Sequence, residues 1–82
     1  MNLSPQEIKE KFGYDFVSEF SEGLACASQS GKWFHIWTDG TPAYEERYEK
    51  VLPFSQGLAR VYKNKRWYYI RADGAIIHFK EK

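Results

Sequence analysis

The sequence has few of the features that would place the protein outside the cell or in a membrane. It contains one cysteine, Cys26, and a single thiol cannot form an internal disulfide. No stretch approaches about 20 apolar residues, so no membrane-spanning helix is indicated. Residues 1–13 have no basic region followed by an apolar run, which argues against a signal peptide. We therefore expect a cytoplasmic protein.

The sequence also lacks the residue patterns that carry catalysis. It has no set of four metal-ligating residues, no glycine-rich phosphate loop, no Ser-His-Asp arrangement and no Cys-x-x-Cys pair. Glu45 and Glu46 are adjacent, but adjacent side chains on an extended segment point in opposite directions and do not converge on a substrate. We expect no catalytic residue, no metal, no cofactor and no enzymatic activity.

Aromatic residues are abundant and must supply the core. The 82 residues indicate one small domain, 1–82, which buries only a modest share of its surface. Aromatic residues make up 18% of the chain. Each buries roughly 150–250 Å², which compensates for the short length.

The net charge of +1 conceals an uneven distribution. Residues 1–49 contain four basic and nine acidic residues, a balance of −5, whereas residues 50–82 contain eight basic and two acidic residues, a balance of +6. This asymmetry predicts a charged partner or head-to-tail self-association of the chain. Drift of surface charge between two repeats is the simpler alternative.

An offset of 34 residues aligns the chain with itself without a gap. Residues 14–48 match residues 48–82, and eleven positions are identical. A period of this length is typical of repeat architectures, which build binding surfaces more often than active sites. We predict repeat 1 at 14–47 and repeat 2 at 48–82. The identical pairs are Tyr14/Tyr48, Val17/Val51, Phe20/Phe54, Ser21/Ser55, Gly23/Gly57, Leu24/Leu58, Ala25/Ala59, Trp33/Trp67, Ile36/Ile70, Asp39/Asp73 and Gly40/Gly74.

A short helix is predicted at residues 4–12. Ser4 is a good N-cap, Pro5 suits the first helical position, and Glu7 completes a capping box. Gly13 can adopt the left-handed conformation that ends a helix. Two turns are not stable alone in water, so this helix must dock through its apolar residues.

The rest of the chain is predicted to form strands and turns. Asp39-Gly40 and Asp73-Gly74 favour two-residue type I′ hairpins, as does Ser30-Gly31, and Asn64-Lys65 is a weaker equivalent. Each repeat is then a meander of three strands. The Tyr-x-x-Val segments at 14–17 and 48–51 are expected to cross between units. The expected strands are 24–29, 32–38 and 41–45, followed by 58–63, 66–72 and 75–79.

Two-residue turns fix the register and therefore the two faces of each sheet. Pairing Gln29 with Lys32 sets small residues opposite large ones on one face, which we assign to the interior. The predicted interior pairs are Ala27 with Phe34, Ala25 with Ile36, Val61 with Tyr68, Ala59 with Ile70, Ile70 with Ile77 and Tyr68 with Phe79. The outer face is unusually aromatic, and neighbouring segments must cover it or leave a binding patch. It carries Leu24, Cys26, Trp33, His35 and Trp37, then Leu58, Arg60, Tyr62, Trp67, Tyr69 and Arg71.

The repeated residues resemble the WG, or KWG, repeat family of bacteria. The matching pieces are Phe-Ser-x-Gly-Leu-Ala at 20–25 and 54–59, the tryptophans at 33 and 67, and the Asp-Gly pairs. The resemblance covers residues 14–82. One departure is that the family has glycine directly after the tryptophan, where this chain has Phe34 and Tyr68. The repeat-defining residues, expected to be structural, are Gly23, Leu24, Trp33, Asp39, Gly40, Gly57, Leu58, Trp67, Asp73 and Gly74.

Cys26 and His35 are placed opposite each other on neighbouring strands by the predicted register. A Cys/His pair can support nucleophilic catalysis or form half of a metal site. Repeat 2 has Arg60 and Tyr69 at these positions, and variation between the copies favours a role in packing.

The family resemblance implies an interaction module without a shared catalytic residue. We therefore predict a protein-interaction module, with a partner that is acidic where it meets the basic second half. The alternative is single-stranded nucleic-acid binding, because cations and aromatic rings interleave between Arg60 and Arg71. The predicted binding residues are Trp37, Arg60, Tyr62, Tyr69 and Arg71.

Overall fold

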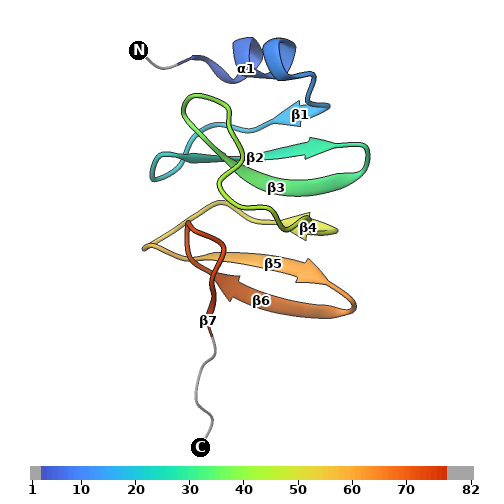
Figure 1. Cartoon of the computed structure of the whole chain (residues 1–82). Helices are drawn as coiled ribbons and strands as arrows, with labels where there is room; N and C mark the ends of the chain where they lie inside the picture. Colours follow the sequence, from blue (N-terminus) through green and yellow to red (C-terminus); the bar gives the residue numbers. More distant parts are fainter. Residues whose placement is uncertain (1–2, 78–82) are drawn as a thin grey trace, which may run out of the picture.

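The computed structural model describes residues 3–77 and shows a mostly β protein with one short helix (Figure 1). The helix lies at one end, and the strands follow along the molecule in chain order. They form two antiparallel sheets, β1-β2-β3 and β4-β5-β6-β7. Within the described residues, no helix is long and apolar enough to cross a membrane. The elements are α1 (Pro5–Phe12), β1 (Phe16–Val17), β2 (Leu24–Gln29), β3 (Lys32–Trp37), β4 (Lys50–Val51), β5 (Ala59–Lys63), β6 (Arg66–Ile70) and β7 (Ile76–Ile77).

The helix α1 forms as its capping residues predict. The Ser4 hydroxyl accepts a hydrogen bond from the Glu7 backbone N–H at 3.1 Å, and the Glu7 carboxylate accepts one from the Ser4 N–H at 2.8 Å. Gly13 ends the helix with a φ of 75°, in the left-handed region. Ile8 is fully buried, so the helix docks through its apolar face.

The strand composition of each repeat differs from the predicted three-stranded meander. Residues 41–45 form no strand, and only an isolated bridge joins Ile36 to Pro42. Proline has no N–H to donate, which prevents a regular ladder there. The segments predicted to cross between units instead contain the edge strands β1 and β4, which pair with β2 and β5. Repeat 2 therefore has four strands rather than three.

The turns at Ser30-Gly31 and Asn64-Lys65 are two-residue turns with positive φ at both positions. They pair Gln29 with Lys32 and Lys63 with Arg66, which confirms the predicted register of the long hairpins. Lys65 adopts a φ of 66° although it replaces the glycine of the first copy.

The prediction of two-residue turns at Asp39-Gly40 and Asp73-Gly74 is wrong. Only the glycines have positive φ, and each closes a three-residue loop, in which the Gly74 N–H bonds to the Arg71 carbonyl at 2.9 Å. This longer loop pairs Ile70 with Ile76 instead of Ile77. The predicted pairing of Tyr68 with Phe79, and the end of the strand at 75–79, lie outside the described residues.

The predicted interior face is the core. The small and large residues that face one another on the long hairpins are buried in both sheets, and Tyr68 is partly buried. The interior assignment of Ile77 is wrong, because Ile77 pairs with Tyr69 and therefore lies on the opposite face. Side chains from α1 and from the segments that link the strands complete the core. The buried members on the sheets are Ala25, Ala27, Phe34, Ile36, Ala59, Val61 and Ile70.

The two repeats are joined by contacts that follow the 34-residue period. Trp33 and Tyr48 exchange two backbone hydrogen bonds of 2.8 Å, which connect β3 to the start of repeat 2. In repeat 1 the equivalent N–H, that of Tyr14, bonds at 3.1 Å to the Lys9 carbonyl of α1. The helix therefore supplies to repeat 1 the acceptor that β3 supplies to repeat 2, as a capping element does in a repeat array.

The turn before the first long strand provides a second link. The Glu22 carboxylate accepts hydrogen bonds from the backbone N–H groups of Gln56 and Gly57, at 2.5 and 2.9 Å. The Ser21 hydroxyl donates to the Phe54 carbonyl at 2.8 Å. These bonds fix the loop of repeat 2 against the loop of repeat 1.

Candidate functional site

The centre of the outer face of repeat 1 is an internal interface. Leu24, Cys26 and His35, which project from this face, are at most 5% exposed. The Phe54 ring packs against His35, with their ring centroids 4.5 Å apart in an edge-on arrangement. Of the two alternatives left open by the sequence, covering by a neighbouring segment therefore applies at this part of repeat 1, where repeat 2 packs against His35.

His35 is fixed in one neutral form by its two partners. Its Nε2 lies 2.8 Å from the Leu52 carbonyl oxygen, which can only accept, so Nε2 carries the proton. Nδ1 then accepts a hydrogen bond of 2.6 Å from the Tyr44 hydroxyl. Burial lowers the pKa of His35 below its ordinary value, and the bond to the Leu52 carbonyl opposes this shift.

The Cys26 and His35 pair lies across β2 and β3 as predicted, but its surroundings favour packing. Burial raises the pKa of the Cys26 thiol, and the hydrogen bond from Ser18 partly offsets that rise. A raised pKa leaves little of the reactive thiolate. Both ring nitrogens of His35 already have partners. Among residues 3–77 no group of three His, Cys, Asp or Glu residues is placed to hold a metal ion.

The same face of repeat 2 is exposed. Tyr69, which replaces His35, is 37% exposed, and Trp67 is 43% exposed. Arg60 replaces Cys26 and is exposed as well. We call this surface the repeat-2 face, and it consists of Leu52, Leu58, Arg60, Tyr62, Trp67, Tyr69 and Arg71.

Cations and rings lie against one another on the repeat-2 face. The Arg60 guanidinium lies 4.9 Å from the Trp67 ring centroid and 5.6 Å from that of Tyr69. The rings of Tyr62 and Trp67 are 5.1 Å apart, and the Lys50 ammonium lies 5.4 Å from the Tyr62 ring. Each exposed cation–π contact contributes about 0.5–1 kcal/mol, so the contacts hold the side chains in a defined arrangement.

Two grooves border this arrangement. The larger has a volume of about 490 Å³, and the smaller, of about 280 Å³, lies where the two repeats meet. Leu52 lines both, and among the described residues no acidic side chain lines either. The larger is lined by Leu52, Pro53, Ser55, Gln56, Leu58, Arg60 and Tyr69. The smaller is lined by Trp33, Lys50, Val51, Leu52 and Trp67.

The structure brings together only some of the predicted binding residues. Arg60, Tyr62 and Tyr69 lie on one face, and Arg71 is exposed just after β6. Trp37 is 39% exposed, but it ends β3 in the other sheet and lines neither groove.

Three residues of the site were missed by the sequence analysis. Leu58 was assigned a structural role as a repeat-defining residue, although it lines the larger groove. Trp67 was assigned a structural role as a repeat-defining residue, although it is exposed and lines the smaller groove. Its place on the outer face, two residues before Tyr69, was the available signal. Leu52 is 42% exposed and lies directly after the segment 48–51 predicted to cross between units, where no signal marked it.

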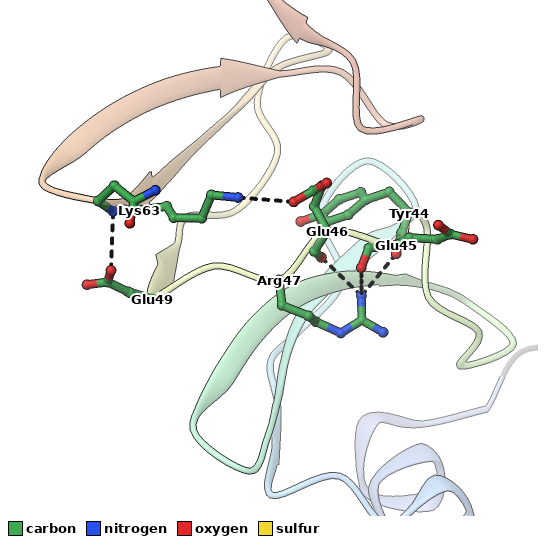
Figure 2. A network of polar contacts seen from close by, with 7 residues as sticks. Tyr44, Glu45, Glu46, Arg47, Glu49 and Lys63 are labelled. Carbon is green, nitrogen blue, oxygen red and sulfur yellow. Dashed lines mark hydrogen bonds and ion pairs between the residues drawn. The ribbon is translucent and has the colours of Figure 1, made fainter.

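The link between the repeats carries several exposed acidic residues, and the polar contacts of this segment lie within the protein (Figure 2). The Arg47 guanidinium donates to the carbonyl oxygens of Tyr44, Glu45 and Glu46 at 2.9–3.1 Å. Lys63 pairs with Glu46 at 3.1 Å, and this hydrogen bond raises the pKa of Lys63. The adjacent carboxylates therefore form part of a folded loop and do not converge on a site.

Comparison with known protein families matches one family, described as WG containing repeat, at residues 10–33 and 38–67. The two matches cover most of the chain and end at residues 33 and 67, which keeps the 34-residue offset. Their boundaries differ from the repeats predicted at 14–47 and 48–82. Comparison with curated proteins and with solved structures finds no match.

Proposed function

The chain belongs to the WG-containing repeat family, and we propose that it is a non-catalytic protein-interaction module that binds its partner through the repeat-2 face. One observation carries this proposal. The outer face that repeat 2 covers in repeat 1 is, in repeat 2, an exposed surface with two grooves.

The residue types on the repeat-2 face support this role. Tryptophan, tyrosine and arginine dominate the energetic centres of protein interfaces, and all three occur here within two neighbouring strands. Their side chains are already arranged by ring and cation contacts, which reduces the entropy lost on binding. An exposed cluster of large apolar side chains is also typical of interaction surfaces.

The charge of the surface favours an acidic partner. Arg60 lies in the larger groove and Lys50 lines the smaller one, whereas no acidic residue of the described chain lines either groove. Complementary charge accelerates association and discriminates against basic partners. The prediction of head-to-tail self-association rests on the same charges, and sedimentation at low and high salt tests it.

The environment of the reactive side chains supports a non-catalytic role. Cys26 and His35 are buried, the Phe54 ring packs against His35, and both ring nitrogens of His35 have hydrogen-bond partners. A nucleophile and base must instead reach a substrate.

The test is capture of binding proteins from a lysate of the source cells by the immobilised chain. Ile76→Ala is the matched control, because Ile76 is 41% exposed and lines neither groove. We expect wild type and the control to retain a discrete protein that Tyr69→Ala loses. Equal capture by all three would contradict the proposal. Capture of nucleic acid that falls steeply with added salt would favour the nucleic-acid alternative instead.

A further inference from the structure

The contact between the repeats shows what this kind of face binds. On repeat 1, Phe54 places its ring against His35, and the Leu52 carbonyl accepts a hydrogen bond from that imidazole. The Phe54 carbonyl accepts another from the Ser21 hydroxyl. The two residues after Ser55 then form a turn whose N–H groups bond to the Glu22 carboxylate. The bound element is therefore a short extended segment with an aromatic residue, followed directly by a tight turn.

The larger groove is the exposed counterpart of that binding site. Each of its lining residues has an equivalent 34 positions earlier in repeat 1, and three of these equivalents, His35, Ser21 and Glu22, contact the covering segment directly. Tyr69 corresponds to His35, Ser55 to Ser21, Gln56 to Glu22, Leu58 to Leu24, Arg60 to Cys26, Leu52 to Ser18 and Pro53 to Glu19. The groove volume of about 490 Å³ is sufficient for an aromatic side chain and its neighbours.

The residues that differ between the covered site of repeat 1 and the larger groove of repeat 2 indicate how their ligands differ in charge. Where repeat 1 has the uncharged Cys26, repeat 2 has the cationic Arg60 at the wall of the groove. The carboxylate of Glu22 is replaced by the amide of Gln56, which can still accept from turn N–H groups and adds no negative charge. A carboxylate beside the aromatic residue would pair with Arg60, as Arg binds planar carboxylates well.

We infer that the larger groove binds an acidic segment of a separate protein, in which an aromatic residue is flanked by carboxylates and followed by a tight turn. This inference rests on the proposed function and specifies its ligand. A separate protein is favoured over a second copy of this chain. The Tyr48 N–H bonds to β3, whereas the equivalent N–H of Tyr14 already bonds to α1, which also contacts β1. The helix thus covers the edge that a second copy would have to present.

Two peptides copied from the chain serve as probes. Residues 17–24, Val-Ser-Glu-Phe-Ser-Glu-Gly-Leu, have an aromatic residue flanked by two carboxylates and followed by the Glu-Gly turn. Residues 51–58, Val-Leu-Pro-Phe-Ser-Gln-Gly-Leu, have the same pattern without charge. Fluorescence anisotropy of labelled peptides with the intact 82-residue chain measures the affinity of each.

We expect saturable binding of the 17–24 peptide, weakened about tenfold or more by Tyr69→Ala or by alanine in place of the peptide phenylalanine. Arg60→Glu should weaken the acidic peptide more than the uncharged one, and Ile76→Ala should change neither. Absence of saturable binding, or binding indifferent to these substitutions, would overturn the inference.

Two further results separate this inference from the proposed function. Protein capture that depends on Tyr69, together with failure of both peptides, would retain the interaction module and overturn only the ligand assigned here. If the intact chain sediments as a dimer that Phe20→Ala converts to a monomer, the ligand is a second copy and a separate partner is wrong.

Discussion

The two repeats share their turns and the register of their long hairpin, yet the centre of the same face is an interface inside the molecule in repeat 1 and a surface in repeat 2. His35 is fully buried, whereas its equivalent Tyr69 is 37% exposed. The difference does not arise within the repeat. It arises because repeat 1 is followed by a unit that covers it, as nearest-neighbour contacts in repeat proteins require.

The residues at equivalent positions have adapted to this difference. Cys26 is small and apolar, and Arg60 is long, charged and exposed. His35 satisfies both of its nitrogens inside the protein, whereas Arg60 and Tyr69 contact one another at the surface. The comparison teaches that the side chain suited to a repeat position depends on whether the neighbouring repeat covers that position.

The largest expected effect is on the residue that covers repeat 1. Phe54 is 2% exposed, so Phe54→Ala should lower the free energy of unfolding by about 3–4 kcal/mol, through the cavity and the lost burial. Phe20 is its equivalent and only partly buried, so Phe20→Ala should cost about 1–2 kcal/mol. Urea unfolding measures both. Equal losses would mean that Phe54 is no more deeply buried than Phe20, and would contradict its role in covering repeat 1.

A second prediction concerns the glycines that receive a covering aromatic side chain. A Cβ on Gly74 would lie 2.7 Å from the Cβ of Tyr44, and the φ of 91° is unfavourable for alanine. Gly74→Ala should cost about 2–3 kcal/mol. Gly57→Ala has a similar φ but no atom within 4 Å of the added Cβ, so about 1 kcal/mol is expected.

Equal thermal shifts for Gly74→Ala and Gly57→Ala would contradict the contact between Tyr44 and the loop of repeat 2. Gly40, which contacts the ring of Phe12, is the corresponding position in repeat 1. Gly40→Ala should therefore resemble Gly74→Ala. That result would show that α1 covers repeat 1 in the way that the link covers repeat 2.

A third prediction uses the pH dependence of the buried histidine. The pKa of His35 is lowered from 6.5 in the folded state, so the unfolded chain binds a proton more readily. Its contribution to stability is complete above pH 6.5 and is lost as the pH falls below that value. The slope for one proton is at most about 1.4 kcal/mol per pH unit.

Urea unfolding between about pH 7.5 and 5.5 measures this slope, with His35→Gln as the comparison. The variant should be less stable at the upper end of this range but should lose less stability on acidification than the wild type. Parallel pH profiles for the two proteins would show that His35 is not protected by repeat 2.

The smallest expected effect on stability is at the equivalent position of repeat 2. Tyr69→Ala removes a side chain that is 37% exposed, so the free energy of unfolding should change by at most about 0.5–1 kcal/mol. The same variant should abolish partner capture. A large loss of stability would place Tyr69 in the core and remove it from the proposed site.

Much of the local structure followed from the sequence. The cap at Ser4 and the stop at Gly13 located the helix, and the small-to-large pairing located the interior face. The Asp-Gly turns were assigned the wrong length, because Asp-Gly suits both a two-residue turn and a three-residue loop that ends in glycine. In this chain the Asp73 carboxylate bonds to the Ala75 N–H at 2.9 Å, which favours the longer loop.

The candidate site was only partly predictable. Alternation along β5 and β6 was sufficient to place Arg60, Tyr62 and Tyr69 on one face. The sequence could not show which of the two equivalent faces was covered, because coverage depends on where the loop containing Phe54 packs. That loop has the same Phe-Ser-x-Gly pattern in both repeats and therefore carried no distinguishing signal.

The most direct measurement compares the reactivity of one thiol at the two equivalent positions. Cys26 is 5% exposed in the covered face, and Arg60 is its exposed equivalent. Under native conditions a thiol reagent should modify the double variant Cys26→Ala, Arg60→Cys at least about a hundredfold faster than the wild type, because Cys26 reacts only when the structure opens. Equal rates in the two folded proteins would show that both faces are open, and would contradict the account.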